Sequence, residues 1–165
     1  YRADPACDNA RNEITFDHPS VYQRYGCVQD LFSDTLDLDP QFQPEPAAAT
    51  SWSVADDGIT WTFHLRPGQM WNDGTPVTAH DYVATFRLCA SPEHTWDFAW
   101  FYSFIGEGGL RNWDRIVAGE LPPDSLGVTA VDALTLQIVT EGPFPAMPSV
   151  MKFGYTLQKR ALLQQ

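Results

Sequence analysis

SWSVADDGITWTFHLRPGQMWNDGTPVTAHDYVATF, which runs from Ser51 to Phe86, is the stretch of sequence that decides the fold of this chain. Its first half alternates apolar and polar residues with a period of two, which is the pattern of a strand with one buried face. The apolar positions of the second strand are Ile59, Trp61, Phe63 and Leu65. Residues 56–58 (Asp-Asp-Gly) supply a tight turn, because glycine accepts a positive φ and aspartate bonds its own backbone. The stretch therefore begins with a predicted β-hairpin.

A capped helix is predicted directly after this hairpin. Thr78 is a good N-cap residue, and Asp81, three positions further on, completes a capping box. Apolar residues then recur at helical spacing, at Tyr82, Val83, Phe86, Cys89 and Ala90. The helix should end at Ser91, since a residue that precedes proline avoids the helical region. We therefore expect a helix of about three turns with one buried stripe, in which Cys89 acts as a small apolar residue.

A second hairpin is predicted over 126–131 and 134–139, with its turn at 132–133. If the two hairpins share one sheet, the fold class is α+β: a twisted antiparallel sheet built from two hairpins, with helices packed on it. The residues that this arrangement places in a shared core are Trp52, Ile59, Trp61, Phe63, Leu65, Val128, Leu136 and Ile138. Helical spacing also appears over 20–36 and 110–118, a short helix begins within 145–151, and a proline-punctuated linker covers 37–46.

Composition narrows the range of functions. The chain has 165 residues, of which 44% are hydrophobic and 19% charged, so it is long enough to bury a sizeable core. Its net charge of −11 excludes nucleic acid and anionic membranes as natural partners, because both need a basic surface. No apolar run approaches the ~18 residues of a membrane span. Neither a secretion signal nor a lipid-attachment motif is present in the sequence. We therefore expect that such a segment was either removed or left out of this sequence.

Residues that carry chemistry are present, but they are not arranged in the motifs of enzymes or metal sites. The histidines His18, His64, His80 and His94 show no metal-ligand spacing, and nucleophile and phosphate-loop motifs are missing. Paired carboxylates such as Asp56 and Asp57 sit in a turn, where solvation is the expected role. The sequence thus predicts neither catalysis nor a cofactor. Whether Cys7 and Cys27 form a disulfide, as an oxidising compartment would permit, stays open.

The pattern DDGxTWTFxLRxGxxWxDGxPVTAxD, which fits residues 56–81, resembles a known protein family. It is similar to the extracytoplasmic solute-binding proteins of ABC importers, family 5, the oligopeptide, dipeptide and nickel class. Weaker likeness extends from about Phe16 to Phe153 and includes the second hairpin. The resemblance implies an N-terminal fragment. Residues 1–45 would form a piece of the main subdomain of the first lobe with its linker, and residues 46–165 the smaller first-lobe subdomain of a periplasmic-binding-protein-like fold.

The resemblance also implies a function. Such proteins capture a small solute, here expected to be an oligopeptide, and deliver it to the permease subunits of an ABC transporter. The chain would then be extracytoplasmic, in the periplasm or on the cell surface, and peripheral to the membrane through the permease or a removed lipid anchor. Relatives close two lobes on the ligand by a hinge motion. Because this chain lacks the second lobe, we expect it to bind solute poorly on its own.

Candidate ligand-binding residues follow from the same resemblance. Phe98, Trp100 and Phe101 match a stretch in which an aromatic side chain of the family faces the ligand, and Phe16 and Asp17 match a short stretch at the cleft edge. Another interpretation stays open for each group. Helical spacing also allows the residues around Phe98 and Phe101 to pack into the core, and an ordinary turn before a helix accounts equally well for Phe16 and Asp17.

Two other functions remain as alternatives. The aromatic segment 96–104 suits an exposed patch of a protein-interaction module. Residues 56–61 also resemble the Asp box of sialidase-like β-propellers, which would make the chain a fragment of a glycosidase-like protein. Propellers carry that motif on several blades, and this chain has one copy.

Overall fold

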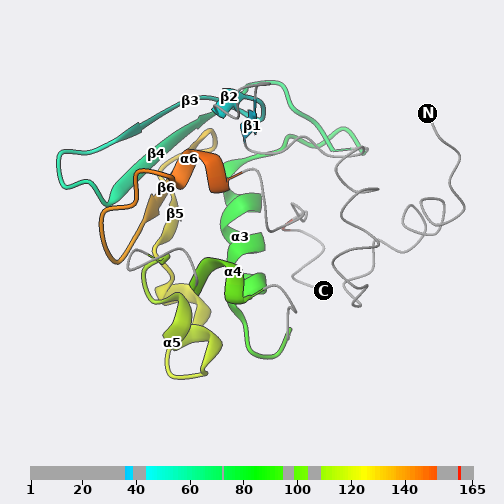
Figure 1. The fold of residues 1–165 in the computed structure, drawn as a ribbon. Helices are drawn as coiled ribbons and strands as arrows, with labels where there is room; N and C mark the ends of the chain where they lie inside the picture. The colour runs from blue at the N-terminus through cyan, green and yellow to red at the C-terminus, as the bar shows by residue number, and fades with distance from the viewer. Residues whose placement is uncertain are drawn as a thin grey trace, which may run out of the picture.

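A four-stranded antiparallel sheet lies on one side of the described structure, with helices packed beside it (Figure 1). The computed structural model describes residues 36–38, 44–71, 73–94, 99–103, 109–151 and 160. The strands are β3 (Ala49–Val54), β4 (Thr60–Leu65), β5 (Val128–Ala130) and β6 (Thr135–Val139), in the order β3-β4-β6-β5. Each predicted hairpin is present, and the pairing of β4 with β6 joins them into one sheet. The α+β class predicted from the sequence is confirmed.

Strand β4 shows why alternation in the sequence decides which face of the sheet is buried. Trp61, Phe63 and Leu65 are at most 6% exposed, whereas His64 on the opposite face is exposed. Across the sheet the buried residues meet others of the same kind: Phe63 pairs with Leu136 and Trp61 with Ile138. Residues opposite one another on paired strands share a face, so these pairs form one continuous apolar layer.

Two members of the predicted core lie at its margin. Trp52 is half-buried and packs against the core from β3, which is an edge strand. Ile59 is also half-buried, and the prediction that it belongs to the core was wrong, because β4 begins only at Thr60. The backbone of Ile59 is used instead: its carbonyl accepts the N–H of Thr140 at 3.0 Å, which extends the β4–β6 ladder by one pair.

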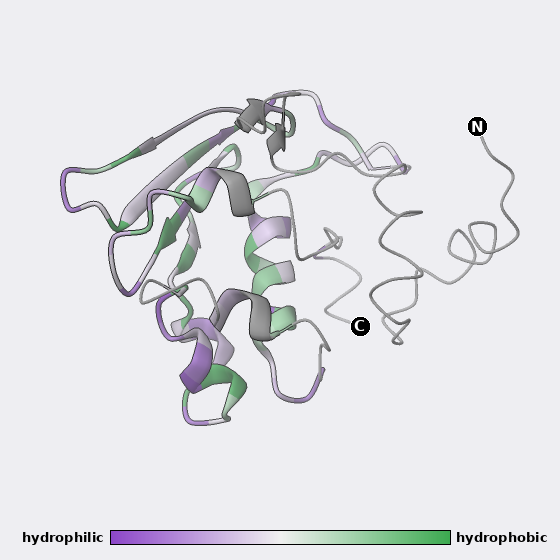
Figure 2. Cartoon of the chain, in the orientation of Figure 1, coloured by the Kyte–Doolittle hydropathy of each residue, from purple (hydrophilic) through white to green (hydrophobic). Residues whose placement is uncertain are grey.

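Asp57 organises the turn between β3 and β4, the hydrophilic tip seen in Figure 2. Its carboxylate accepts the Thr60 hydroxyl at 2.7 Å and the N–H groups of Thr60 and Ile59, both at 2.9 Å. Gly58 takes a φ of 70°, as the turn requires. These three bonds favour the ionised carboxylate and lower the pKa of Asp57, the Thr60 hydroxyl having the largest effect.

Helix α3 (Ala79–Ala90) covers the apolar side of the sheet and begins and ends where the sequence predicts. Thr78 donates from its backbone N–H and its hydroxyl to Asp81 Oδ2, at 2.8 and 2.9 Å. Asp81 Oδ1 accepts the backbone N–H of Arg160 at 2.9 Å, so the cap also holds a later part of the chain. The predicted apolar stripe is buried throughout, including Cys89.

Shorter elements complete the described structure. They are β1 (Leu36–Leu38), β2 (Pro44–Pro46), α4 (Trp100–Ser103), α5 (Trp113–Val117), the 3₁₀ helix η2 (Pro123–Ser125) and α6 (Met147–Val150). β1 and β2 pair with each other, so the ends of the predicted linker over 37–46 form a small antiparallel ladder. The predicted helix over 20–36 lies outside the described residues, apart from Leu36 itself, which belongs to β1. Among the residues that the structure describes, no helix has the length and apolar character needed to cross a membrane.

The helix predicted over 110–118 is shorter than expected. α5 begins at Trp113, because Leu110 forms an isolated antiparallel bridge with Thr140 and so extends the sheet instead. Asn112, with a φ of 67°, turns the chain from this bridge into the helix. The predicted end of this helix at Gly119 is confirmed, because Gly119 has a φ of 75° just beyond the C-terminal end of α5.

Replacement of Asp57 by asparagine should remove a pH-dependent part of the stability. The pKa of Asp57 is lowered by folding, so its contribution is complete above the ordinary value of 3.8 and is lost as pH falls through the lower, folded value. Urea unfolding at a series of pH values should show Asp57→Asn less stable than the parent at neutral pH, and the two converging in acid.

Asp56→Asn, a change to the exposed neighbour in the same turn, is the matched control. It should leave the difference between neutral and acidic pH close to that of the parent. An equal loss in both variants would show that the hydrogen bonds of Asp57 do not cause the effect.

Candidate functional site

Helix α4 is the part of the predicted ligand-binding segment that the structure describes. Trp100 and Phe101 form its first turn, while the placement of their side chains lies outside the described structure. Phe98, Phe16 and Asp17 lie outside the described residues, as do Cys7 and Cys27. Their assignments as ligand-binding residues or as a disulfide therefore stay predictions.

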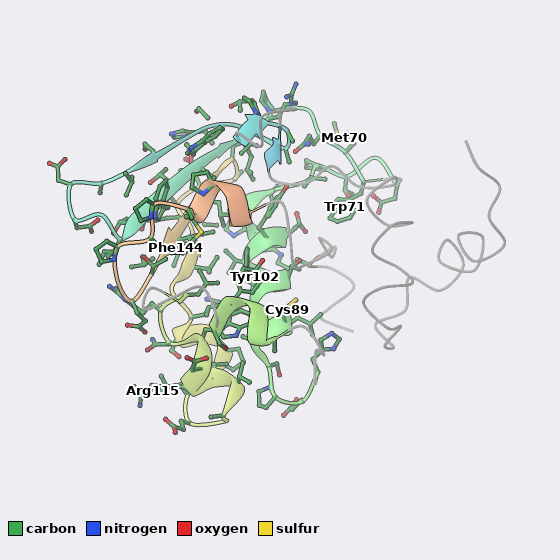
Figure 3. All side chains as sticks on the ribbon, in the orientation of Figure 1. Met70, Trp71, Cys89, Tyr102, Arg115 and Phe144 are labelled. Atoms are coloured by element: carbon green, nitrogen blue, oxygen red, sulfur yellow. The ribbon has the colours of Figure 1, made fainter. Side chains whose placement is uncertain are left out.

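Tyr102 anchors α4 to the core, as Figure 3 shows. Its side chain is fully buried, and its ring lies edge-on to that of Phe86 of α3, with 5.4 Å between centroids. The ring of Trp113 of α5 lies 4.9 Å away on a tilted plane. Aromatic pairs in these geometries add to the stabilisation that comes from burial alone. α4 is thus clamped between α3 and α5 through one side chain.

A hydrogen bond reinforces this aromatic cluster. The indole N–H of Trp113 donates to the carbonyl oxygen of Ala99 at 2.9 Å, directly before α4 begins. Gly109, on the return path of the chain, lies so close to Tyr102 that an added Cβ would be 2.9 Å from the Tyr102 carbonyl oxygen. The backbone of α4 is therefore held on both sides.

The sequence prediction did not single out Tyr102. The helical spacing of the segment assigned Phe98, Phe101 and Ile105 to the core face, and Tyr102, four positions after Phe98 and three before Ile105, lies on that same face. Periodicity thus allows its burial, while the contacts with Phe86 and Trp113 come from other elements of the fold. Of the aromatics in the alternative interaction patch over 96–104, Tyr102 is buried, and the side chains of the others lie outside the described structure.

Backbone hydrogen bonds fasten the segment before α5 to the sheet. Arg111 donates its N–H to the Val139 carbonyl at 2.9 Å, and its own carbonyl accepts the N–H of Gly127 at 3.0 Å. A Cβ on Gly127 would lie 2.6 Å from the Cβ of Arg111, so only glycine permits this approach. Asn112 adds a side-chain bond to the Ser125 carbonyl at 2.7 Å. The start of α5 therefore rests on the end of the second hairpin.

A shallow groove of about 500 Å³ lies between α3 and η2. One wall is the more exposed side of α3, and Arg87 of that wall pairs with Asp124 at 2.9 Å. The lining residues are His80, Val83, Ala84, Arg87, Leu88, Ser91, Pro123, Asp124 and Arg160. The predicted aromatic positions are not among these lining residues, and their side chains lie outside the described structure.

The described residues offer little to reaction chemistry. Within them no group of histidine, cysteine and carboxylate side chains is placed to hold a metal ion. Burial raises the pKa of the Cys89 thiol to about 12, which keeps it protonated and unreactive. The pKa of Asp132 is lowered, chiefly by the hydrogen bond from the N–H of Leu134. This carboxylate therefore stabilises the β5–β6 turn, as Asp57 stabilises the β3–β4 turn. What the arrangement supports is a rigid platform for α4.

Comparison with known families gives one match that covers most of the chain. Residues 43–161 match the family described as bacterial extracellular solute-binding proteins, family 5 middle. The matched span contains the whole four-stranded sheet, α3 and the helices that pack on it.

Individual relatives agree with this match. The periplasmic murein peptide-binding protein MppA of Escherichia coli K12 is 41% identical over 118 residues, which is 72% of this chain and 21% of that protein. The periplasmic oligopeptide-binding protein OppA of Salmonella typhimurium is 39% identical over 117 residues, 71% of this chain and 21% of that protein. The chain thus spans about a fifth of the length of these relatives.

Solved structures show the same fold. The murein tripeptide-binding protein MppA of Escherichia coli superposes with a TM-score of 0.66 at 40% identity, over 72% of this chain and 22% of that one. OppA of Haemophilus influenzae, in complex with the peptide RPPGFSPFR, superposes with a TM-score of 0.73 at 31% identity, over 83% of this chain and 26% of that one.

Replacement of Tyr102 by alanine should lower the free energy of unfolding by about 3–5 kcal/mol, because it leaves a cavity between three helices. Tyr102→Phe keeps the ring packing and should cost less. Chemical denaturation of both variants measures the difference. Similar small losses in the two variants would show that the ring does not hold α4 in place.

Proposed function

The chain belongs to the bacterial extracellular solute-binding proteins of family 5, and from this membership we propose that it is the N-terminal part of the peptide-binding component of an ABC importer. One observation carries the proposal: the match covers residues 43–161, which include the β3–β4 turn and the cap of α3. Relatives at 41% and 39% identity are named as murein peptide-binding and oligopeptide-binding proteins. A peptide is therefore the proposed solute.

The proposed division of the chain follows from the sheet. Residues 46–165 form the smaller subdomain of the first lobe, a division supported by the single core that β3 to β6 share with their helices. Residues 1–45 are a piece of the main first-lobe subdomain with its linker. The remaining first-lobe residues and the second lobe would come from the rest of a protein as long as its relatives.

In this proposal the sheet subdomain acts as a rigid wall of the ligand cleft. Phe98, Trp100 and Phe101 line the mouth of the cleft, with Phe16 and Asp17 at its edge. Support comes from the anchoring of α4 by Tyr102, which fixes the backbone that carries Trp100 and Phe101. A binding residue held in place loses little conformational freedom when the ligand arrives, which favours affinity.

The proposed setting is extracytoplasmic, in the periplasm or at the cell surface, where the protein passes its solute to permease subunits. A pairing of Cys7 with Cys27 would suit that oxidising compartment. The protein binds and releases its solute and is not an enzyme, in keeping with a family of solute-binding proteins. Its attachment to the membrane would run through the permease or a lipid anchor.

Calorimetric titration with a library of short peptides tests the proposal. The 165-residue chain should give weak or no heat of binding, since it lacks the second lobe. The same chain extended to the length of its relatives should bind stoichiometrically. In the extended protein, Phe101→Ala should lower affinity by at least about fivefold while leaving the unfolding midpoint near that of the parent, because hot-spot aromatics contribute 1 kcal/mol or more.

Two results would contradict these expectations. Tight binding by the 165 residues alone would show that the second lobe is not needed. An extended protein that binds no peptide in the library would overturn the assignment of a peptide as the solute.

A further inference from the structure

Strand β3 has an open hydrogen-bonding edge. It is the outermost strand of the sheet and pairs with β4 on one side only, among the residues that the structure describes (Figure 1). The bond from the Ala55 N–H to the Thr60 carbonyl, at 2.9 Å, sets the phase of the ladder. Because bonds alternate along an antiparallel pair, the backbone groups of Ser51 and Ser53 face β4, and those of Trp52 and Val54 face outward.

The composition of this edge does not protect it. Ala49–Val54 reads ATSWSV and contains neither a charged residue nor proline, in a chain that is 19% charged. Natural edge strands avoid unwanted pairing by means of lysine, proline or a bulge. β3 has a register shift at Thr50, but Ser51–Val54 is regular, and Val54 is 45% exposed. Four residues of flat, uncharged edge are therefore free to pair.

Charges of opposite sign stand at the two ends of the strand. Exposed Asp56 lies two residues after the end of β3. At the other end, Arg66 donates its backbone N–H to the Ala48 carbonyl at 2.7 Å and its Nε–H to the Ala47 carbonyl at 3.1 Å. If two such strands pair antiparallel, each acidic turn comes beside the arginine of the other copy. Charge complementarity at the ends of the strand thus favours a second copy in that orientation.

We propose that β3 pairs antiparallel with β3 of a second copy, so that one sheet continues across both molecules. The outward N–H and C=O groups of Trp52 and Val54 form the central hydrogen bonds, and Asp56 of each copy pairs with Arg66 of the other. A surface this small gives a weak dimer, whose population depends on protein concentration. This inference concerns the edge of β3, which contains none of the residues proposed for the solute site.

Analytical ultracentrifugation of the 165-residue chain from about 10 µM to about 1 mM, the range in which small interfaces associate, measures the dimer. Val54→Lys brings two like charges together at the two-fold axis, and Val54→Pro removes an outward N–H without breaking a bond to β4. Both variants should remain monomeric at concentrations where the parent is dimeric. Val131→Lys, the same change at a 61% exposed valine in the β5–β6 turn, should dimerise as the parent does.

A charge exchange tests the orientation. Asp56→Arg and Arg66→Asp should each raise the dimer dissociation constant by about threefold or more, a modest effect typical of exposed ion pairs. The double variant, which restores opposite charges across the interface, should return the constant toward the parental value. If the double variant still dimerises as weakly as the single variants, antiparallel pairing is contradicted.

Amide hydrogen exchange shows which edge is covered. Exchange at Trp52 and Val54 should slow as protein concentration rises, whereas exchange at Val131 should not change. A parent chain that stays monomeric at the highest concentration would overturn the proposal. So would a Val131→Lys variant whose dimer is weakened as much as that of Val54→Lys. Protection of Trp52 and Val54 by an added extended peptide, without any dimer, would assign this edge to a peptide instead.

Discussion

The pairing of β4 with β6 is the interaction on which the rest of the structure depends. β4 is bonded on both edges, to β3 and to β6, and its buried residues Trp61 and Phe63 face Ile138 and Leu136 across the ladder. A slip of one residue would turn this apolar face toward water and bring His64 and its polar neighbours inside. Because the two hairpins are far apart in sequence, this pairing also closes the longest loop of the sheet, and the helices pack on the surface that it creates.

Everything that supports α4 follows from that surface. α3 lies on the apolar layer and is capped by Thr78 and Asp81. Its residue Phe86 packs against Tyr102. The chain then returns along the end of the second hairpin, where Gly127 allows Arg111 to approach closely enough for backbone bonding. Tyr102 and Trp113 close the cluster. α4 is only four residues long and could not be stable by itself, so its position is a product of the tertiary contacts around it.

This dependence bears on the proposed function. A cleft that closes by hinge motion needs walls that do not deform, and the sheet subdomain offers such a wall through its single core. The chain spans about a fifth of the length of its relatives, so in the proposed function the opposite wall would come from the part of such a protein that this chain does not match.

The sequence by itself determined the local elements: the two hairpins with their Asp-based turns, the capped helix α3 and its buried stripe. Each of these elements depends on contacts within a few residues, and periodicity and turn chemistry predict such contacts from the sequence. Tertiary structure alone decided that Tyr102 is held between Phe86 and Trp113, that Leu110 bridges to Thr140 rather than starting a helix, and that Ile59 stays at the margin. Those outcomes depend on partners in other elements of the fold, whose positions no local pattern encodes. The ligand-facing roles of Phe98, Trp100 and Phe101 stay predictions, because a cleft is defined by the surfaces that face each other across it.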